Sequence, residues 1–324
     1  MPGLGTFISV GRSLDQALDR VRRADELGYD STYVTHIAGR DSLTVLMAYA
    51  AVSERIKLGT GVLPIYSRTP VATAQQAATI DEYAGGRMVL GLGVSHEVTV
   101  TNWYGTTLER PLKAMRDYLG IVRASFRGED PPDGEIFRSR FRFMGYAPRP
   151  DIPIYVAALS PRMLRLAGEI ADGAMLWLCN PSYIRNVVLP EVEAGRERAG
   201  RSLEGFDVVA AVPAAVTDDK AAAYETMRGD LVTYWSLPFY RAMIERSGFA
   251  EDIARFDEGM QAGDVERAKA AISDRFLDEL TAIGSPEDVR AGIDRYVDAG
   301  ATSPGVGAVP KTDFNRTLET AKPA

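Results

Sequence analysis

The chain has 324 residues, of which 46% are hydrophobic and 25% are charged, proportions that are typical of a soluble globular protein. Its 37 basic and 44 acidic side chains give a net charge of −7, which disfavours nucleic acid and anionic membrane surfaces as partners. Cys179 is the single cysteine and the chain has two histidines, so we expect neither an intrachain disulfide nor a metal site. No signal peptide or membrane-spanning run is visible, and we therefore expect a cytoplasmic protein.

Apolar runs of strand length alternate with segments of helical periodicity in the first part of the chain. Ser13 is expected to cap the first helix and Gly28 to end it. The pattern predicts, in chain order, strand 7–10, helix 14–27, strand 32–35, helix 43–52, strand 56–62, helix 71–83, strand 88–92 and helix 112–126.

Two longer segments interrupt this alternation in the rest of the chain. Residues 127–150 contain several prolines and are expected to form an inserted hairpin or loop, whereas residues 219–283 are helical and too long for a single crossover. Around these segments the pattern predicts strand 154–157, helix 163–171, strand 174–178, a helix to about residue 198, strand 208–216, helix 286–299, strand 305–309 and helix 313–321.

The repeated order of strand and helix predicts an α/β fold with a parallel sheet and helices outside it. Eight such repeats favour closure into a (β/α)₈ TIM barrel over an open doubly wound sheet. We expect one domain over residues 1–324, with insertions after the fourth and seventh strands at about 127–150 and 219–283. In such a barrel the functional residues lie at the carboxyl rim, where the strands end.

The stretch LGLGVSHE, residues 90–97, contains the first two glycines of a dinucleotide-binding fingerprint. His96 stands where the fingerprint requires a third glycine, and residues 97–106 do not have the pattern of a helix start. The stretch therefore indicates a different use of Gly91 and Gly93, namely the close approach of a ligand to the end of a strand.

Both histidines, His36 and His96, fall at the predicted carboxyl rim, together with Gly59, Gly61 and Trp177. Each has an ordinary alternative explanation: a histidine that only forms rim hydrogen bonds, glycines that serve a tight turn, and a tryptophan that fills the core. Their joint placement favours a ligand site more strongly than any one of them does.

The dipeptide Ser160-Pro161 has the residue types preferred at the N-cap and the first position of a helix. The small residues Ala157 and Ala158 precede it. A helix N-terminus presents free N–H groups and a partial positive charge, which suits a phosphate. The alternative is an ordinary capped helix with no ligand.

Residues 58–96, with the sequence LGTGVLPIYSRTPVATAQQAATIDEYAGGRMVLGLGVSH, resemble the luciferase-like flavin and deazaflavin oxidoreductases, which are (β/α)₈ barrels. Further similarity lies at 33–43, 101–105, 155–177 and 282–301. Within that family the motifs GLGVSH and NWYG are most similar to the branch that uses coenzyme F420 and transfers a hydride at the deazaflavin C5. The other branch uses reduced FMN and oxygen in monooxygenase reactions.

The resemblance implies a cofactor site made of residues from several strand ends: His36, Gly61, Val62, Gly93, Val94, Ser95, Ala157, Ala158, Leu159, Ser160 and Trp177. It implies a cis peptide bond between Gly61 and Val62 beneath the ring, and backbone amides of residues 157–159 on the phosphate. His36 and His96 are the candidate catalytic residues, because histidine exchanges a proton near neutral pH. Some relatives place a carboxylate at the ends of the first two strands, and this chain has none there.

The resulting hypothesis is an F420-dependent oxidoreductase that transfers a hydride between the cofactor and a small organic substrate. One alternative is an FMN-dependent monooxygenase that consumes oxygen, and another is a flavin-binding protein without turnover. A homodimer is also expected. The aromatic segment YWSLPFY, residues 234–240, is interpreted either as a lid over the substrate or as part of a subunit interface.

Overall fold

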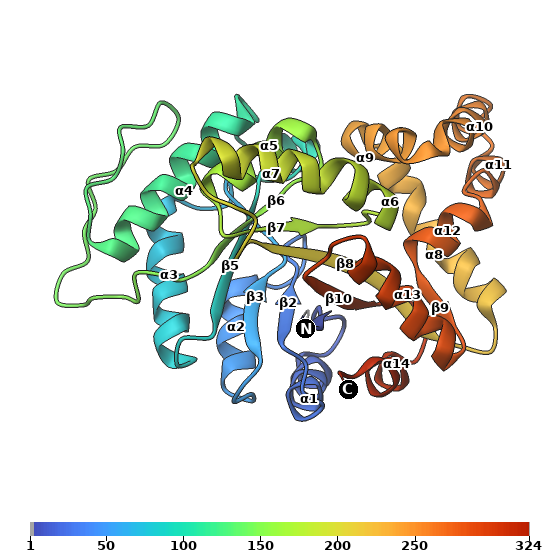
Figure 1. The fold of residues 1–324 in the computed structure, drawn as a ribbon, viewed down its shortest axis with the longest axis horizontal. Helices are drawn as coiled ribbons and strands as arrows, with labels where there is room; N and C mark the ends of the chain where they lie inside the picture. The colour runs from blue at the N-terminus through green and yellow to red at the C-terminus, as the bar shows by residue number, and fades with distance from the viewer. Residues whose placement is uncertain (1–2, 324) are drawn as a thin grey trace.

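The computed structural model describes residues 3–323 of the chain. The barrel strands are β1 (Gly5–Phe7), β2 (Ser31–Val34), β3 (Lys57–Thr60), β5 (Met88–Gly93), β6 (Ile154–Ala157), β7 (Gly173–Leu176), β8 (Asp207–Val216) and β10 (Ser303–Ala308). All are parallel, and β10 pairs with both β1 and β8, so the sheet closes on itself. The short strands β4 (Leu63–Pro64) and β9 (Ala282–Gly284) add to β5 and β8. The predicted (β/α)₈ barrel is confirmed (Figure 1).

Helices cover the outside of the barrel (Figure 1). They are α1 (Leu14–Glu26), α2 (Ser42–Ala50), α3 (Pro70–Tyr83), α4 (Pro111–Arg127), α5 (Pro161–Ile170), α7 (Leu189–Arg198), α13 (Pro286–Asp298) and α14 (Phe314–Ala321). The short helix α6 (Pro181–Tyr183) and the π-helix η2 (Ile184–Val188) lead directly into α7. Side chains that accept a hydrogen bond from a first-turn amide begin many of them: Ser13, Asp41, Thr69, Ser160, Ser285 and Asp313. These caps satisfy N–H groups that a helix start otherwise leaves unpaired.

Aromatic side chains fill the barrel interior below the rim. The ring centroids of Phe7 and Tyr33 lie 5.3 Å apart, in a cluster that also contains Tyr155 and Met175. Gly59 makes room for this packing, because an added Cβ there would lie 2.5 Å from an atom of the Tyr33 ring. Since the interior is filled, a ligand has space only above this cluster, at the carboxyl rim.

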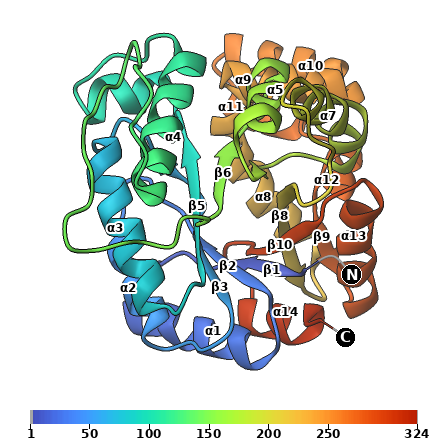
Figure 2. The ribbon, with the colours of Figure 1, turned by 60° about the vertical axis from the view of Figure 1, so that its left-hand side comes forward.

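The first insertion, residues 127–150, forms a loop without strands, so the hairpin is excluded and the loop alternative holds. The loop packs along α3 and α4 on the outer wall (Figure 2). The Tyr146 hydroxyl donates to the Ala78 carbonyl at 3.0 Å, Arg149 pairs with Asp81 at 2.9 Å, and the Ile136 amide donates to Asp117 at 2.7 Å. Side-chain contacts with α3 and α4 therefore hold this loop where a sheet partner was expected.

Two local expectations were wrong. The first strand covers residues 5–7 rather than 7–10, because the chain leaves the sheet after Ile8, whose carbonyl accepts a hydrogen bond from the Tyr49 hydroxyl at 2.9 Å. The stretch after His96 does turn into a helix, the short π-helix η1 (Thr99–Trp103). The amides of Thr99 and Val100 both donate to the His96 carbonyl, which starts this turn.

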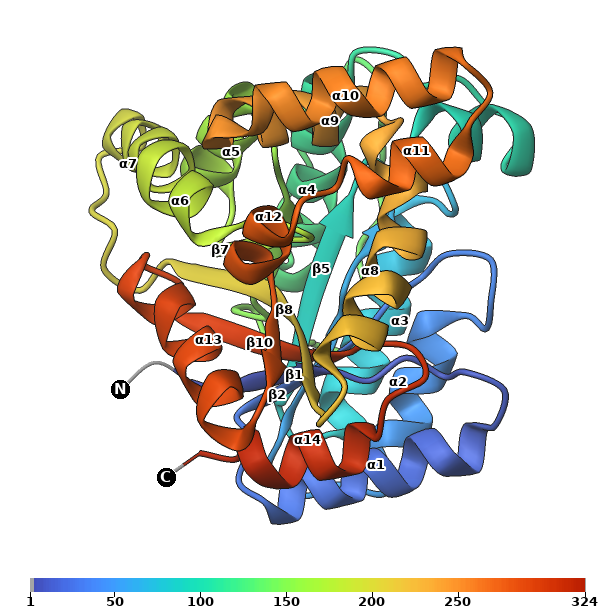
Figure 3. The same ribbon diagram turned by 90° about the vertical axis from the view of Figure 1, so that its right-hand side faces the viewer.

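The second insertion is helical, as predicted, and lies above the carboxyl ends of the strands (Figure 3). It comprises α8 (Lys220–Trp235), α9 (Pro238–Ile244), the π-helix η3 (Glu245–Phe249), α10 (Ala250–Gln261), α11 (Val265–Ala270) and α12 (Asp274–Leu280). Trp235 is fully buried there, with ring centroids 5.5 Å from Phe256 and 5.2 Å from Phe276. In residues 3–323 we find no helix with the length and apolar character of a membrane span.

Candidate active site

The rim has an apolar centre formed by Val62. The peptide bond between Gly61 and Val62 is cis, as the sequence resemblance implies. Val62 packs on the aromatic cluster of the barrel interior. An added Cβ at Gly93 would lie 2.6 Å from the Val62 side chain, and one at Gly91 would lie 2.1 Å from the Thr60 carbonyl. The glycines of LGLG thus make room for this chain's own Val62 and strand β3, rather than directly for a ligand.

His36 follows β2 and is held by the start of α2. The Ser42 amide donates to His36 Nδ1 at 3.3 Å, and the Ser42 hydroxyl lies 3.1 Å from the same atom. Burial lowers the pKa of His36, the positive charge of Arg68 lowers it further, and Asp41 opposes both. Because Nδ1 accepts from an amide, the neutral ring carries its proton on Nε2. His36 can therefore donate a hydrogen bond from Nε2 near neutral pH.

Asp41 and Arg68 form an ion pair beside His36. The Asp41 carboxylate also caps α2 by accepting from the Thr44 amide at 2.8 Å. Burial alone would raise the pKa of Asp41, but the hydrogen bonds from Arg68 and Thr44 lower it to about 2. The carboxylate therefore stays ionised and lies 3.8 Å from His36 Nδ1. The ion pair orders the start of α2, whose Ser42 holds His36, and it provides no proton donor.

Several buried polar atoms have no hydrogen-bond partner among residues 3–323: the hydroxyls of Tyr66 and Tyr104, Arg68 Nε and Trp177 Nε1. Buried polar groups are normally paired, so each calls for a ligand, a water molecule or an ion. Tyr66 and Tyr104 follow β4 and η1 on the side of the rim that also carries Arg68. Trp177 packs on the same aromatic cluster as Val62, and a polar donor next to an apolar surface is a feature that a flavin-like ring requires.

His96 lies against the helical insertion. Its ring centroid is 5.9 Å from that of Tyr240, and burial lowers the pKa of the imidazole. The neighbouring Val94 is partly buried, and Ser95 has a left-handed backbone with φ of 62°. The segment 94–96 thus turns away from β5 towards the insertion. His36 and His96 contact different elements, and among the described residues a hydrogen bond to the imidazole sets the tautomer of His36 only.

The start of α5 presents free amides at the rim. Ser160 caps the helix by accepting from the Met163 amide at 3.3 Å. Leu159, Ser160 and Arg162 have amides with no hydrogen bond to the described part of the chain. Ala158 differs, because its amide donates to the Met175 carbonyl at 3.3 Å and its side chain is buried. An anion at this position would meet the amides of Leu159, Ser160 and Arg162, whereas the Ala158 amide, which was expected to bind the phosphate, is already paired.

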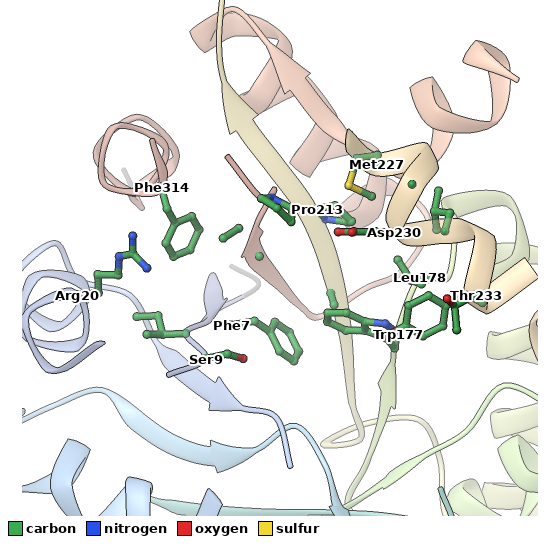
Figure 4. Close-up of a pocket in the computed structure, with 18 residues that line it drawn as sticks. Phe7, Ser9, Arg20, Trp177, Leu178, Pro213, Met227, Asp230, Thr233 and Phe314 are labelled. Atoms are coloured by element: carbon green, nitrogen blue, oxygen red, sulfur yellow. The ribbon is translucent and has the colours of Figure 1, made fainter. Parts of the chain in front are cut away.

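A pocket of about 550 Å³ opens between the rim and helix α8. Its walls are mostly apolar, and Figure 4 shows Trp177 and Asp230 on one side and Arg20 and Phe314 on the other. The Trp177 ring packs edge-on against Phe7, with centroids 5.9 Å apart. The pocket as a whole is lined by Phe7, Ile8, Ser9, Arg20, Trp177, Leu178, Ala211, Pro213, Met227, Gly229, Asp230, Leu231, Thr233, Tyr234, Gly307, Ala308, Pro310 and Phe314.

Asp230 is the one carboxylate among the described residues that line this pocket. It remains accessible to solvent, and partial burial raises the pKa of its carboxyl while Lys311 opposes that shift. Sequence reasoning missed Asp230 as a pocket residue, because the part of the second insertion around it carries no motif, whereas it did single out the segment that begins at Tyr234. Of the residues predicted for the site, Trp177 alone lines the pocket. The residues of segment 234–240 have different surroundings: Tyr234 lines the pocket, Trp235 is buried in the core of the insertion, and Phe239 is exposed to solvent.

Comparison with known proteins decides the family. A family model described as luciferase-like monooxygenase matches residues 2–303. The chain belongs to this family. Over 306 residues, this luciferase-like protein is 32% identical to the 5,10-methylenetetrahydromethanopterin reductase of Archaeoglobus fulgidus, and the match covers 92% of this chain and 91% of the relative.

Two solved structures share the whole fold of this chain. The coenzyme F420-dependent tetrahydromethanopterin reductase of Methanopyrus kandleri superposes with a TM-score of 0.85 at 24% identity, covering 99% of this chain and 97% of the other. An F420-dependent secondary alcohol dehydrogenase in complex with an F420-acetone adduct gives a TM-score of 0.81 at 21% identity, with the same coverage. At these identities the likeness establishes the fold, including the insertions.

Proposed function

We propose that this luciferase-like protein is a coenzyme F420-dependent oxidoreductase that transfers a hydride between the deazaflavin C5 and a small organic substrate. The observation that carries the proposal is the rim itself, where Val62 and Trp177 pack on the same aromatic cluster and the buried Trp177 Nε1 has no hydrogen-bond partner among residues 3–323. The A. fulgidus relative, named as a reductase, supports a reductive rather than an oxygen-dependent reaction.

Residues of this chain fit the parts of such a cofactor. Val62 would lie under the ring, and the hydroxyls of Tyr66 and Tyr104 would pair with its polar edge. The free amides of Leu159 and Ser160 at the α5 start would bind the phosphate. When bound, the deazaflavin supplies or accepts the hydride. The protein contributes position, a donor at His36 Nε2, and exclusion of water by the helical insertion.

The adjoining pocket would hold the substrate. Its apolar walls suit a small organic molecule, and Trp177 would orient that molecule against the rim. Reduction of a carbonyl or imine carbon requires a proton at the oxygen or nitrogen. Asp230 would provide it, since a carboxyl with a raised pKa keeps a larger protonated fraction near neutral pH. This residue takes the place of the carboxylates that are absent from the first two strand ends.

A fluorescence titration with F420 and with FMN tests the proposal. We expect F420 to bind at least about tenfold more tightly, a difference of about 1.4 kcal/mol. Each complex is then mixed with reductant, carbonyl and imine substrates, and oxygen uptake is recorded. Tighter FMN binding with oxygen uptake would identify a monooxygenase instead. Binding of either cofactor without any turnover would identify a flavin-binding protein.

A further inference from the structure

A second hollow lies on the outer wall of the barrel, between α4, α5 and α7, and has a volume of about 230 Å³. We call it the α5 groove. Helices α4 and α7 both pack against α5 here (Figure 1). Most of its lining is cationic, and the lining residues are Leu112, Lys113, Arg116, Arg162, Arg165, Leu166, Glu169 and Arg198.

Acidic neighbours neutralise three of the five cations in the groove. Lys113 pairs with Glu135, Arg116 with Glu169 at 2.8 Å, and Arg165 with Glu191 at 2.5 Å. The two others, Arg162 and Arg198, are exposed and form no ion pair with residues 3–323. In a chain with a net charge of −7, this is a local excess of positive charge. The groove is therefore suited to an extended anion rather than to another basic surface.

The groove starts at the carboxyl rim and continues down the outer wall. Lys113 and Arg162 lie in the first turns of α4 and α5, and the helices of a barrel start at the rim. Glu169 and Arg198 lie in the last turns of α5 and α7. From Arg162 to Glu169 a helix rises about 10 Å, which is the length of the groove along α5. Its upper end adjoins Ser160, where the free amides are.

We infer that the α5 groove binds the oligoglutamate tail of F420, an inference that rests on the proposed function. A cofactor phosphate at the α5 amides would leave the tail next to Arg162. The tail is a chain of carboxylates, and the two arginines without an ion pair among residues 3–323 lie in the first turn of α5 (Arg162) and the last turn of α7 (Arg198). FMN ends at its phosphate and leaves the groove empty. The groove thus provides a reason for this chain to prefer the deazaflavin cofactor.

The test measures binding by fluorescence for three probes: F420 with its full tail, F420 trimmed to the phospholactyl group, and F0, which lacks phosphate and tail. The variant is Arg162→Gln with Arg198→Gln. Its control is Arg127→Gln with Arg290→Gln, exposed arginines on α4 and α13 outside the groove. Arg127, like Arg198, lies in the last turn of an outer helix, so both variants lose a similar helix-end charge.

We expect the groove variant to bind full-length F420 roughly three- to thirty-fold more weakly, the range for two partly exposed ion pairs. Added salt should reduce the difference from wild type, because it screens exposed charges. The trimmed F420 and F0 should bind all variants within about twofold. Equal affinity of wild type and groove variant for full-length F420 would overturn the inference. The inference would also be overturned if the groove variant lost as much affinity for the trimmed form as for full-length F420, because the arginines would then bind the phosphate.

The same measurements separate this inference from the proposed function. If wild type binds none of the three deazaflavins, the proposed function fails and the inference fails with it. If wild type binds all three with one affinity, the function stands and the tail has no site in the groove. Competition by a free oligoglutamate peptide against full-length F420, but not against F0, would support the groove as the tail site.

Discussion

Asp230 is the residue whose chemistry the proposed reaction depends on most. Its carboxyl must be protonated to act as an acid, so activity should fall as pH rises through its raised pKa. Asp230→Asn should lower kcat by roughly a hundredfold or more and remove this alkaline limb, because an amide cannot donate the proton in the same way. A pH profile of F420H2 oxidation with the best carbonyl substrate measures both effects.

Asp294→Asn is the matched control for that variant, since Asp294 is an exposed carboxylate on α13 away from the pocket. It should retain the wild-type profile. If Asp230→Asn keeps both the rate and the alkaline limb, the proton comes from another donor, and His36 Nε2 becomes the first candidate. Weaker substrate binding by Asp230→Asn, with an unchanged shape of the pH profile, would show that Asp230 contributes to substrate affinity and not to proton transfer.

At the scale of an element, the start of α5 should distinguish an anion site from an ordinary cap. Asp and Asn both cap helices well, so Ser160→Asp and Ser160→Asn should each preserve the melting temperature within about 2 °C. Only the aspartate places a negative charge beside the free amides of Leu159, Ser160 and Arg162. We expect Ser160→Asp to weaken F420 binding at least about fivefold through like-charge repulsion, whereas Ser160→Asn stays near wild type.

Affinity for F0, which has no phosphate, serves as the reference for these two variants. It should be the same for both. Equal F420 affinity in Ser160→Asp and Ser160→Asn would place the phosphate elsewhere on the rim. Ala158 is unsuitable for the same experiment, because it is buried and a glutamate there would disrupt the fold.

For the whole molecule, we expect barrel and helical insertion to unfold as one unit. The insertion is attached at both ends, since α8 follows β8 and α12 leads into β9, which pairs with β8. Trp177 reports on the rim and Trp235 on the core of the insertion. Two variants, Trp103→Phe with Trp235→Phe and Trp103→Phe with Trp177→Phe, each leave one of these probes in place.

Urea unfolding of each variant should give the same midpoint by tryptophan fluorescence and by far-ultraviolet circular dichroism, the behaviour of a two-state domain. A Trp235 signal that changes at lower urea than the circular dichroism would show an insertion that unfolds separately. The prediction of a single domain would then be wrong, although the barrel assignment would stand.

The sequence by itself determined the architecture, because local patterns carry that information. Strand 154–157 was predicted with its observed bounds, and Ser13 caps α1 as expected. Apolar periodicity depends on which face of an element is buried, and eight repeats of it leave few folds other than a closed barrel. The cis bond at Gly61 was available only through the family resemblance, since no local pattern specifies it.

Tertiary structure alone decided the composition of the pocket. Asp230 and Trp177 are far apart in the chain and meet because α8 crosses the rim after β8. The same holds for the α5 groove, which combines the first turns of α4 and α5 with the last turn of α7. Residues that are brought together by packing between elements leave no periodic signal in any one segment. The set of residues that lines the pocket and the groove could therefore be identified only from the tertiary structure.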